Sequence, residues 1–304
     1  MSKSSKSVAK PKAAVPQKKK RKSDDYKGRI KPIWCPGCGD YGVLNAMIKS
    51  FADLEIDPNN LAIATGIGCS SRLPGFIKCY GFHSAHGRAL PVAAGIKLGN
   101  PRLTVVAAGG DGDGLSIGMG HFPHICRRNM DITYILMDNR IYGLTKGQTS
   151  PTTRQGFTTK TSPDGVVEPS INPVEMAITF GASFVARGYS AEQKELQKMI
   201  TEAIEHPGFS LVHVITPCVT FGKGSGFDYF KDLVKPLPEG FDRSDRRAAL
   251  EAAWELLPIY TGVMYQVERE EYVSQIQSFG AARGRELDDE CPDIDVERII
   301  SRFS

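Results

Sequence analysis

The sequence lacks the features of membrane and exported proteins. No apolar run approaches the ~18 consecutive residues of a membrane-spanning helix, and the basic N-terminus has no apolar segment of the secretory type. We therefore expect a cytoplasmic protein without a membrane partner. Collagen-like and coiled-coil repeats are also missing. A content of 41% apolar and 24% charged residues over 304 positions is typical of a folded protein with a sizeable core.

Acidic residues are missing from the first 22 positions, which hold nine Lys and Arg. Because the formal net charge of the chain is +4, the remaining residues sum to −5. A basic run from Lys18 to Lys22 is compatible with a nuclear signal or a nucleic-acid patch. The segment has no periodic apolar residues, so we interpret residues 1–28 as a disordered, solvated tail and expect no nucleic-acid partner.

Cysteines are few, and their number is odd. The chain has seven, which points to a reducing compartment where thiols serve as ligands or core residues rather than as disulfides. One CxxC pair, Cys35 and Cys38, is present, but no second CxxC and no His-x₃₋₅-His completes a zinc site. We assign Cys79, Cys126 and Cys291 to packing or to no particular role.

Short apolar runs alternate with amphipathic segments from Trp34 onward. The expected strands are Leu61–Thr65, Leu103–Ala108, Ile132–Asp138, Ser183–Arg187 and Leu211–Thr216, and the expected helices are Tyr41–Leu54, Ala89–Leu98, Ser116–Asn129, Pro173–Phe180 and Glu192–Glu205. Continuous apolar strands indicate a sheet covered on both faces. The pattern therefore predicts an α/β fold with a doubly wound, mostly parallel sheet over residues 29–218. We expect residues 219–304 to form a C-terminal extension, with a helix at Arg246–Leu257.

Residues that could carry chemistry follow several predicted strands, and the carboxyl ends of parallel strands meet at one edge of a sheet. In Gly110-Asp111-Gly112-Asp113, the glycines let a phosphate approach the backbone and Asp111 offers an oxygen ligand for Mg²⁺. Asn139 ends the next strand, 28 residues later. A carboxylate, an amide oxygen and a nearby carbonyl at adjacent strand ends predict a Mg²⁺ site that leaves positions for phosphate and water.

Two further cysteines, Cys69 and Cys218, also follow predicted strands. Together with Cys35 and Cys38 they would place four thiolates at the edge that carries Asp111, which is the ligand set of a 4Fe–4S cluster. From the residues alone, the alternative that Cys69 and Cys218 are small buried core residues stays open.

Five longer stretches make the sequence, from about Ile30 to about Glu270, resemble the beta subunit of 2-oxoacid:ferredoxin oxidoreductases. They are WCPGCGDYGVLNA, TGIGCSSR, HSAHGRALPVAAGIKL, GGDGDGLSIGMGHF and MDNRIYGLTKGQTSPTT. The resemblance implies a thiamine diphosphate site beside one 4Fe–4S cluster bound by Cys35, Cys38, Cys69 and Cys218. It implies Mg²⁺ ligands at Asp111, Asn139 and the main-chain carbonyl of Ile141. The implied cofactor-lining residues are Ile67, Gly68, Cys69, Ser70, His86, Gly110, Gly112, Asp113, Gly143 and Leu144.

Two residues are candidates for catalysis. His86 has an imidazole that could donate to the reacting oxygen of the substrate, although a packed or phosphate-facing histidine is equally compatible with the sequence. Lys146, in YGLTKGQ, is the candidate partner of the substrate carboxylate, with a solvated loop lysine as the alternative. The form LTKGQ resembles that of 2-oxoglutarate-type and broad-specificity members of the family. We therefore expect 2-oxoglutarate as substrate, and pyruvate or mixed specificity stays open.

The activity implied by the resemblance is oxidative decarboxylation of a 2-oxoacid, or the reverse carboxylation, with coenzyme A taking the acyl group and ferredoxin the electrons. No glutamate in this chain fits the residue that activates thiamine diphosphate, which the family carries on the alpha subunit. We therefore expect activity only together with an alpha subunit. A self-contained thiamine decarboxylase is an alternative, but such enzymes typically need nearly twice this length. A zinc- and nucleic-acid-binding protein would use the CxxC pair and the basic tail, and would be colourless rather than brown.

Overall fold

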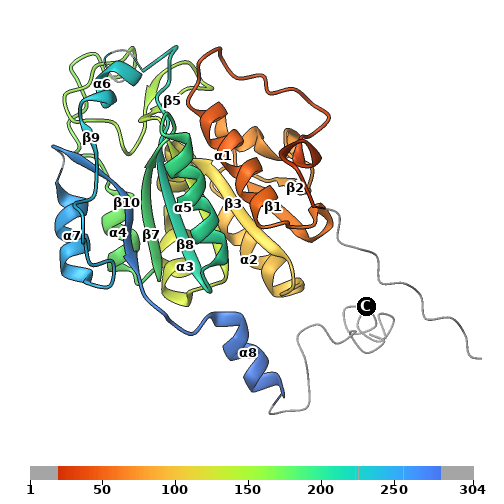
Figure 1. Ribbon diagram of the computed structural model, residues 1–304. Helices are drawn as coiled ribbons and strands as arrows, with labels where there is room; N and C mark the ends of the chain where they lie inside the picture. Colours follow the sequence, from red (N-terminus) through yellow and green to blue (C-terminus); the bar gives the residue numbers. More distant parts are fainter. Residues whose placement is uncertain (1–19, 223, 225, 256, 282–304) are drawn as a thin grey trace, which may run out of the picture.

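The computed structural model describes residues 20–222, 224, 226–255 and 257–281. Residues 1–19 of the predicted disordered tail, and Cys291, lie outside the described residues. The prediction is wrong for the end of that tail, because Ser23–Tyr26 forms a 3₁₀ turn and Tyr26 is buried in the core. The described part is built on an eight-stranded sheet with helices on both faces (Figure 1).

The sheet is parallel except at one place. Its strands are β1 (Leu61–Thr65), β2 (Tyr80–His83), β3 (Thr104–Gly110), β4 (Ile132–Asp138), β7 (Phe184–Tyr189), β8 (Phe209–Ile215), β9 (Val234–Pro236) and β10 (Ile259–Gln266). Their order across the sheet is β2-β1-β3-β4-β8-β7-β10-β9, and β7 with β10 is the antiparallel pair. A separate hairpin consists of β5 (Ile141–Tyr142) and β6 (Gln148–Thr149). The five predicted strands and the mostly parallel sheet are confirmed.

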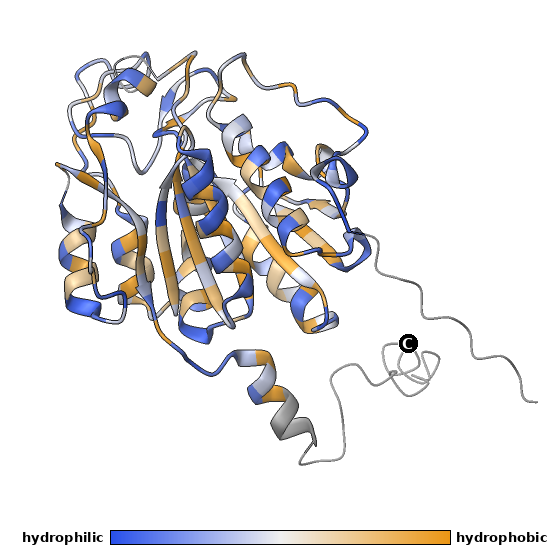
Figure 2. Ribbon diagram, viewed as in Figure 1, coloured by the Kyte–Doolittle hydropathy of each residue, from blue (hydrophilic) through white to orange (hydrophobic). Residues whose placement is uncertain are grey.

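Helices cover both faces because alternate strand residues bury their side chains on opposite sides. In β1, Ile63 belongs to the core under α1 (Asp40–Asp53) and α5 (Gln193–Glu205). Its neighbours Ala62 and Ala64 belong to the core on the other face. The helices of that face are α2 (Ala89–Gly99), α3 (Phe122–Arg128), α4 (Pro173–Thr179) and α7 (Arg246–Trp254). Figure 2 shows the apolar strands between helices whose outer surfaces are hydrophilic.

The α5 helix illustrates how the sequence pattern becomes packing. The spacing of Leu196, Met199, Ile200, Ala203 and Ile204 predicts an apolar stripe on one face of this helix. The first four are buried and Ile204 is half-buried. Burial of one such aliphatic side chain contributes roughly 1.5–3 kcal/mol, so the stripe more than offsets the poor intrinsic stability of an isolated short helix. Within the described residues, no helix combines the length and apolar character needed to cross a membrane.

The prediction of one helix over Ser116–Asn129 is wrong. The chain forms a π-helical turn at Asp113–Ile117 and a 3₁₀ turn at Met119–His121, and α3 begins only at Phe122. Gly118 and Gly120 weaken regular helix in this stretch, and Pro123 is suited to the first turn of a new helix. The turn that follows the Gly-Asp-Gly sequence is therefore π-helical, a form that occurs often at functional sites.

Beyond Cys218 the chain returns to the main sheet. After the short helix α6 (Phe227–Lys231) come β9, α7 and β10, and β10 pairs along β7 with register Val263 to Ala186. The predicted helix Arg246–Leu257 is confirmed but ends at Trp254. Helix α8 (Tyr272–Ala281) follows. Two strands of the predicted extension are thus strands of the central sheet, while the boundary at residue 218 stays a prediction.

Candidate functional site at the carboxyl edge of the sheet

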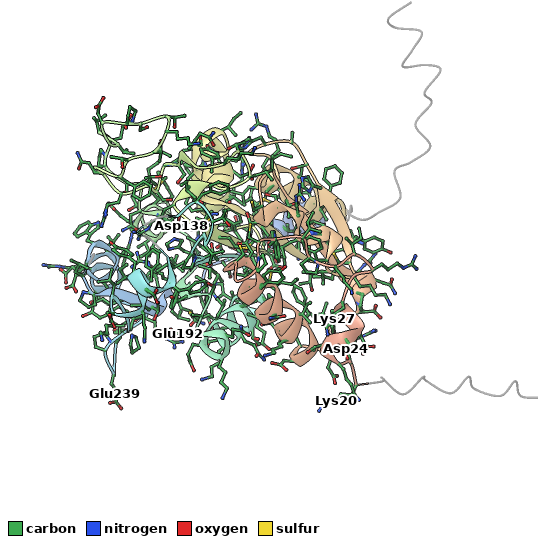
Figure 3. All side chains as sticks on the ribbon, turned by 90° about the horizontal axis from the view of Figure 1, so that it is seen from above. Lys20, Asp24, Lys27, Asp138, Glu192 and Glu239 are labelled. Atoms are coloured by element: carbon green, nitrogen blue, oxygen red, sulfur yellow. The ribbon has the colours of Figure 1, made fainter. Side chains whose placement is uncertain are left out.

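Four neighbouring strands end at the same edge and lead into the loops that carry the predicted ligands. Cys69 follows β1, Asp111 follows β3, Asn139 follows β4 and Cys218 follows β8, and these strands are adjacent in the order β1-β3-β4-β8. The topology thus brings together residues that are far apart in the sequence. Seen from above, Asp138 at the end of β4 lies well inside the molecule, whereas Lys20, Asp24 and Lys27 lie at its margin (Figure 3).

The CxxC segment forms a tight turn. The Cys38 N–H donates to the Cys35 carbonyl at 3.0 Å, and Gly37 between them has φ of +81°. Pro36 before a left-handed glycine is the combination that a type II turn requires. The sequence Cys-Pro-Gly-Cys is therefore sufficient to hold both cysteines on one small loop, where Cys35 is exposed and Cys38 is half-buried.

Two hydrogen bonds join this turn and its flanks to the other two cysteine loops, and a glycine lies between the sulfurs of those two loops. The Gly39 N–H donates to the Pro217 carbonyl at 3.3 Å, next to Cys218. The Trp34 indole N–H donates to the Cys69 carbonyl at 2.7 Å. A Cβ on Gly143 would lie 3.7 Å from the Cys69 sulfur and 3.8 Å from the Cys218 sulfur, so these two sulfurs flank the same glycine. The structure thus gathers the four predicted cysteines at one place.

The electrostatics of the thiols reflect this proximity. Burial raises the pKa of Cys69 to about 11, with the charges of Asp40 and Cys218 acting in the same direction. Burial likewise raises the pKa of Cys38, again together with Asp40 and the neighbouring cysteines. Thiolates here would need positive charge from a bound group. In the described part of the chain, no three Cys, His, Asp or Glu side chains converge on a point for a single ion.

Asp111 and Asn139 lie side by side as predicted. The Asn139 backbone N–H donates to Asp111 Oδ1 at 3.3 Å, and the Asn139 side-chain oxygen accepts the Ile141 N–H at 3.0 Å. Asp111 is buried, and burial together with the Asp138 charge raises its pKa to about 7. A buried carboxylate next to an amide oxygen fits Mg²⁺, which prefers oxygen ligands.

Three residues that were not predicted from the sequence form a series of contacts leading away from Asp111. The Thr152 hydroxyl lies 2.8 Å from Asp111 Oδ2 and 2.7 Å from Asp138 Oδ1. His213 Nε2 lies 2.9 Å from Asp138 Oδ2. Burial lowers the pKa of His213, so the neutral imidazole donates from Nε2 to the carboxylate. One signal for this group was available in the sequence, because His213 is a polar residue within the apolar strand LVHVIT.

Asp113 joins the loops that follow three strands. Its Oδ1 accepts the backbone N–H of Ile67 at 2.9 Å and of Gly87 at 2.7 Å. His86 Nδ1 lies 2.9 Å from the same oxygen. Asp113 is buried, whereas the His86 side chain is 39% exposed. The aspartate predicted to line the cofactor is therefore directed at the backbone of neighbouring loops, and the partly exposed imidazole of His86 lies beside it.

The remaining predicted lining residues surround these groups. The Tyr142 hydroxyl donates to the Gly112 carbonyl at 2.9 Å, and a Cβ on Gly112 would overlap the Tyr142 ring. Ser70 is buried, with its hydroxyl 3.1 Å from the position of a Cβ on Gly110. Gly68 has φ of +131°.

Two predicted lining residues have exposed apolar side chains. Ile67 and Leu144 are 37% and 44% exposed. Exposed apolar side chains beside a polar cradle are suited to contact with a bound ring system or a partner chain.

Lys146 lies at the turn of the β5–β6 hairpin. Its backbone is left-handed, with φ of +76°, and its N–H donates to the Gly143 carbonyl at 3.1 Å. The side chain is exposed. A non-glycine residue in this conformation costs roughly 1–2 kcal/mol, which is offset by the surrounding turn.

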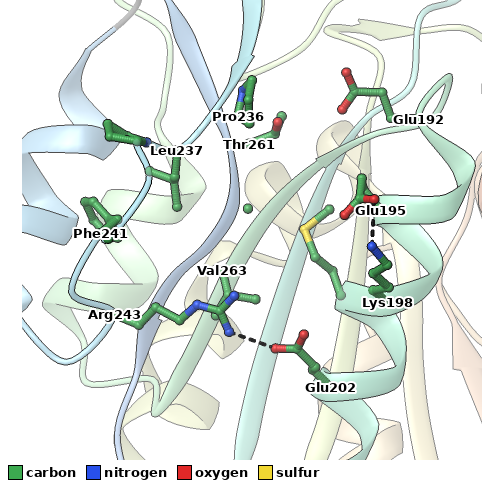
Figure 4. A pocket seen from close by; sticks show the side chains of 14 residues that line it. Glu192, Glu195, Lys198, Glu202, Pro236, Leu237, Phe241, Arg243, Thr261 and Val263 are labelled. Atoms are coloured by element: carbon green, nitrogen blue, oxygen red, sulfur yellow. Dashed lines mark hydrogen bonds and ion pairs between the residues drawn. The ribbon is translucent and has the colours of Figure 1, made fainter.

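A cavity of about 570 Å³ lies elsewhere, between α5 and β10 (Figure 4). Glu195 and Glu202 on α5 face it together with Glu192 just before that helix, and Arg243 pairs with Glu202 at 3.0 Å. Its lining residues come from α5, β10 and the segment between β9 and α7. The cavity is therefore separate from the loops at the carboxyl edge.

Comparisons with known proteins agree with this geometry. Residues 65–214 match the model of the C-terminal TPP-binding domain of thiamine pyrophosphate enzymes, and residues 218–280 match the C-terminal region of pyruvate ferredoxin oxidoreductase beta subunits. The chain is 48% identical over 220 residues to the beta subunit of 2-oxoacid:ferredoxin oxidoreductase 2 from Aeropyrum pernix, a match that covers 72% of this chain and 71% of the relative. It is 40% identical over 245 residues to the 2-oxoglutarate synthase subunit KorB of Archaeoglobus fulgidus, covering 81% and 88%.

A solved structure is similar over nearly the whole chain. It is the 2-oxoglutarate:ferredoxin oxidoreductase from Magnetococcus marinus with 2-oxoglutarate, coenzyme A and succinyl-CoA bound, with a TM-score of 0.86 and 42% identity. The match covers 93% of this chain and 96% of that chain. With relatives of more than 30% identity matched over most of their length, the chain belongs to the family of 2-oxoacid:ferredoxin oxidoreductase beta subunits.

Proposed function

We propose that this chain is the cofactor-binding beta subunit of a 2-oxoglutarate:ferredoxin oxidoreductase. The observation that supports it most is the meeting of four cysteines with Asp111 and Asn139 at one edge of the sheet. Relatives named for 2-oxoglutarate, and the similar structure with 2-oxoglutarate and coenzyme A bound, favour this substrate over pyruvate.

In this proposal Asp111, Asn139 and the carbonyl of Ile141 hold Mg²⁺, and Cys35, Cys38, Cys69 and Cys218 hold a 4Fe–4S cluster. When bound, thiamine diphosphate supplies the nucleophilic carbon for decarboxylation, and the cluster supplies a path for single electrons. Asp111 is pre-positioned by the Asn139 N–H and the Thr152 hydroxyl, so the chain orients the ligand before the ion arrives.

Two side chains of this chain act on the substrate in the proposal. His86 Nδ1 lies 2.9 Å from Asp113 Oδ1, and the partly exposed imidazole can donate a hydrogen bond to a bound ligand. Lys146 is exposed on its turn, so its ammonium can pair with a substrate carboxylate as a compact point charge.

The partner in the proposal is an alpha subunit, which the naming of the relatives as beta subunits implies. It supplies the glutamate that activates thiamine diphosphate, and ferredoxin takes the electrons. The exposed Ile67 and Leu144 beside the site provide apolar surface for such a partner or for the cofactor.

Anaerobic co-expression with the alpha subunit, followed by a panel of 2-oxoacids with coenzyme A and a viologen acceptor, tests the proposal. We expect brown protein with four irons per beta subunit, the highest kcat/KM for 2-oxoglutarate, and no activity of the beta chain alone. A higher kcat/KM for pyruvate would overturn the substrate assignment. Colourless protein containing zinc, or robust activity of the isolated chain, would overturn the proposal itself.

A further inference from the structure

Thr152 is placed between the two buried carboxylates at the ends of β3 and β4. Its hydroxyl lies 2.8 Å from Asp111 Oδ2 and 2.7 Å from Asp138 Oδ1, and its side chain is almost completely buried. It comes from the segment after β6, so a third piece of chain reaches across the two strand ends. A serine or threonine in an ordinary loop turn would bond its own backbone instead.

The loop that carries Thr152 is held on both sides. The Ser150 N–H donates to the Thr153 hydroxyl oxygen at 2.7 Å, and the Thr153 hydroxyl donates to the Arg140 carbonyl at 2.7 Å. The Ile171 N–H donates to the Pro151 carbonyl at 2.9 Å. These bonds fix the backbone around Thr152, so its hydroxyl has little freedom to follow a carboxylate that moves.

Hydrogen bonds also hold the Asp138 carboxylate and backbone in place, so Asp138 is a fixed partner for the Thr152 hydroxyl. His213 Nε2 approaches its Oδ2 at 2.9 Å, and the Arg140 N–H donates to its Oδ1 at 3.0 Å. The Thr216 N–H donates to the Asp138 backbone carbonyl at 2.8 Å. The series His213, Asp138, Thr152 and Asp111 is therefore continuous, and only its last member faces the neighbouring Asn139.

We propose that Thr152 is a positioning residue, whose hydroxyl fixes the rotamer of Asp111 so that Oδ1, beside Asn139, is presented to the divalent cation of the cofactor. This inference deepens the proposed function and depends on its Mg²⁺ site. Mg²⁺ tolerates little deviation from octahedral geometry, so a carboxylate that is held in one orientation binds it better than one that rotates. Partners of this kind, one bond removed from the metal, typically change metal affinity 10- to 100-fold when they are lost.

The arrangement also has a cost that a purely structural role would not explain. One hydroxyl hydrogen lies between two buried carboxyl oxygens, so Thr152 can donate to only one of them at a time. A valine of the same shape would avoid this competition. Two carboxylates gathered around one hydroxyl are favourable when a cation lies next to one of them.

Mn²⁺ binding to the assembled alpha–beta enzyme tests the inference without using activity. The loss of the free Mn²⁺ electron paramagnetic resonance signal is titrated in the presence of saturating thiamine diphosphate. We expect Thr152→Val to raise the apparent Kd for Mn²⁺ about 10- to 100-fold and Thr152→Ser, which keeps the hydroxyl, to stay within about threefold of the wild type. Thr152→Ala is measured in parallel, because it introduces no additional methyl group.

Thr133→Val is the matched control. Thr133 is a buried threonine on β4, and its hydroxyl donates to the Ala203 carbonyl at 3.1 Å, far from the carboxyl edge. We expect it to lower stability without changing Mn²⁺ affinity. Wild-type affinity in Thr152→Val or Thr152→Ala would overturn the inference. Failure of both to assemble while Thr152→Ser assembles would also overturn it, since the hydroxyl would then serve folding. If the wild type does not bind Mn²⁺ with thiamine diphosphate, the proposed function fails instead.

Discussion

At the scale of single residues, the site depends on glycines that leave room for particular side chains. Gly66 is buried, and a Cβ there would overlap the Asp113 carboxylate, which in turn accepts the N–H groups of Ile67 and Gly87. Gly112 leaves room for the Tyr142 ring in the same way. The glycines are therefore required by close packing, not only by the approach of a phosphate.

Replacing Gly66 by alanine should destabilise the fold. The methyl group would displace the Asp113 carboxylate from its two backbone donors, and overpacking of this kind costs typically 1–3 kcal/mol. We expect the free energy of unfolding to fall by about 2 kcal/mol in denaturant titrations. Gly95→Ala in α2 is the control, because open space surrounds a Cβ there and alanine favours helix, so stability should hold or rise. Equal stability of the two variants would contradict the packing argument.

Lys146 offers a test of substrate recognition. Because its side chain is exposed and its turn is fixed by backbone bonds, Lys146→Gln should remove the charge without disturbing the cofactor loops. A hydrogen bond to a charged group contributes about 1.5–3 kcal/mol, so KM for 2-oxoglutarate should rise about 10- to 100-fold with iron content unchanged. Lys160→Gln, at another exposed loop lysine, should leave KM as in the wild type. An unchanged KM in Lys146→Gln would remove Lys146 from substrate binding.

The sequence predicts some residues of the candidate site but not others, and single residues show why. Asp111 and Asn139 were found because each directly follows a strand, and strand order alone makes them neighbours. The sequence does not predict Thr152 as a site residue, because its position depends on the path of the chain through the β5–β6 hairpin. Arg140, just before this hairpin, and Lys146, within it, both have left-handed backbone conformations. No local pattern encodes such a path, because these residue types disfavour the conformation they adopt.

At the scale of elements, the CxxC turn is positioned by the segment after β8. A Cβ on Gly39 would lie 2.8 Å from the Thr216 backbone, so the turn approaches this segment as closely as the lack of a side chain allows. The start of α1 and the end of β8 are therefore in direct backbone contact, and Cys38 and Cys218 are brought together by that contact.

Gly39→Ala should consequently separate the two loops. Backbone cannot give way as a flexible side chain can, so we expect the iron content per chain and the absorbance near ~400 nm to fall by at least about half. Gly226→Ala serves as the comparison, because it lies beyond Cys218 in open space. Full iron content in Gly39→Ala would show that the contact with Thr216 does not position the cluster ligands.

The break in the predicted helix after Asp113 belongs to this scale too. The apolar, glycine-containing stretch from Ser116 to Asn129 predicts one helix, but the chain changes from π to 3₁₀ to α geometry within Asp113–Arg128. The Gly118 N–H donates to the Asp113 carbonyl at 3.1 Å, which closes the wider turn. Periodicity cannot distinguish these forms over so few residues, because a single inserted residue changes the turn while the apolar positions stay similar.

At the scale of the whole molecule, the central sheet is completed by residues beyond the predicted main domain. Strand β10 pairs with β7, whose residues are all buried, and β10 is itself bordered by β9. Met264 and Val273 belong to the same core as α3 and α4. The alternation of strand and helix could not reveal this, because β10 follows its parallel neighbour β9 through α7 but pairs with β7 in the antiparallel direction, and the sequence pattern does not encode that pairing.

A chain ending at Cys218 should therefore fold poorly. Truncation removes β9 and β10 and exposes the apolar edge of β7, which creates an unpaired strand edge prone to association. We expect mostly insoluble protein, or a Tm at least about 10 °C below that of the full chain, because far more than 1 kcal/mol of burial is lost. A soluble fragment with the Tm of the full chain would establish residues 29–218 as an independent domain.

The contact between Gly39 and Pro217 also bears on the order in which the protein is completed. Three of the four cysteines precede β3, but Cys218 is made only after β8, and β8 is an inner strand that must enter between β4 and β7. The Asp111–Asn139 pair needs only β3 and β4 and can form earlier in synthesis. Under the proposed function, insertion of the iron–sulfur cluster is therefore a late maturation step, and the colour of the protein reports that the centre of its sheet has closed.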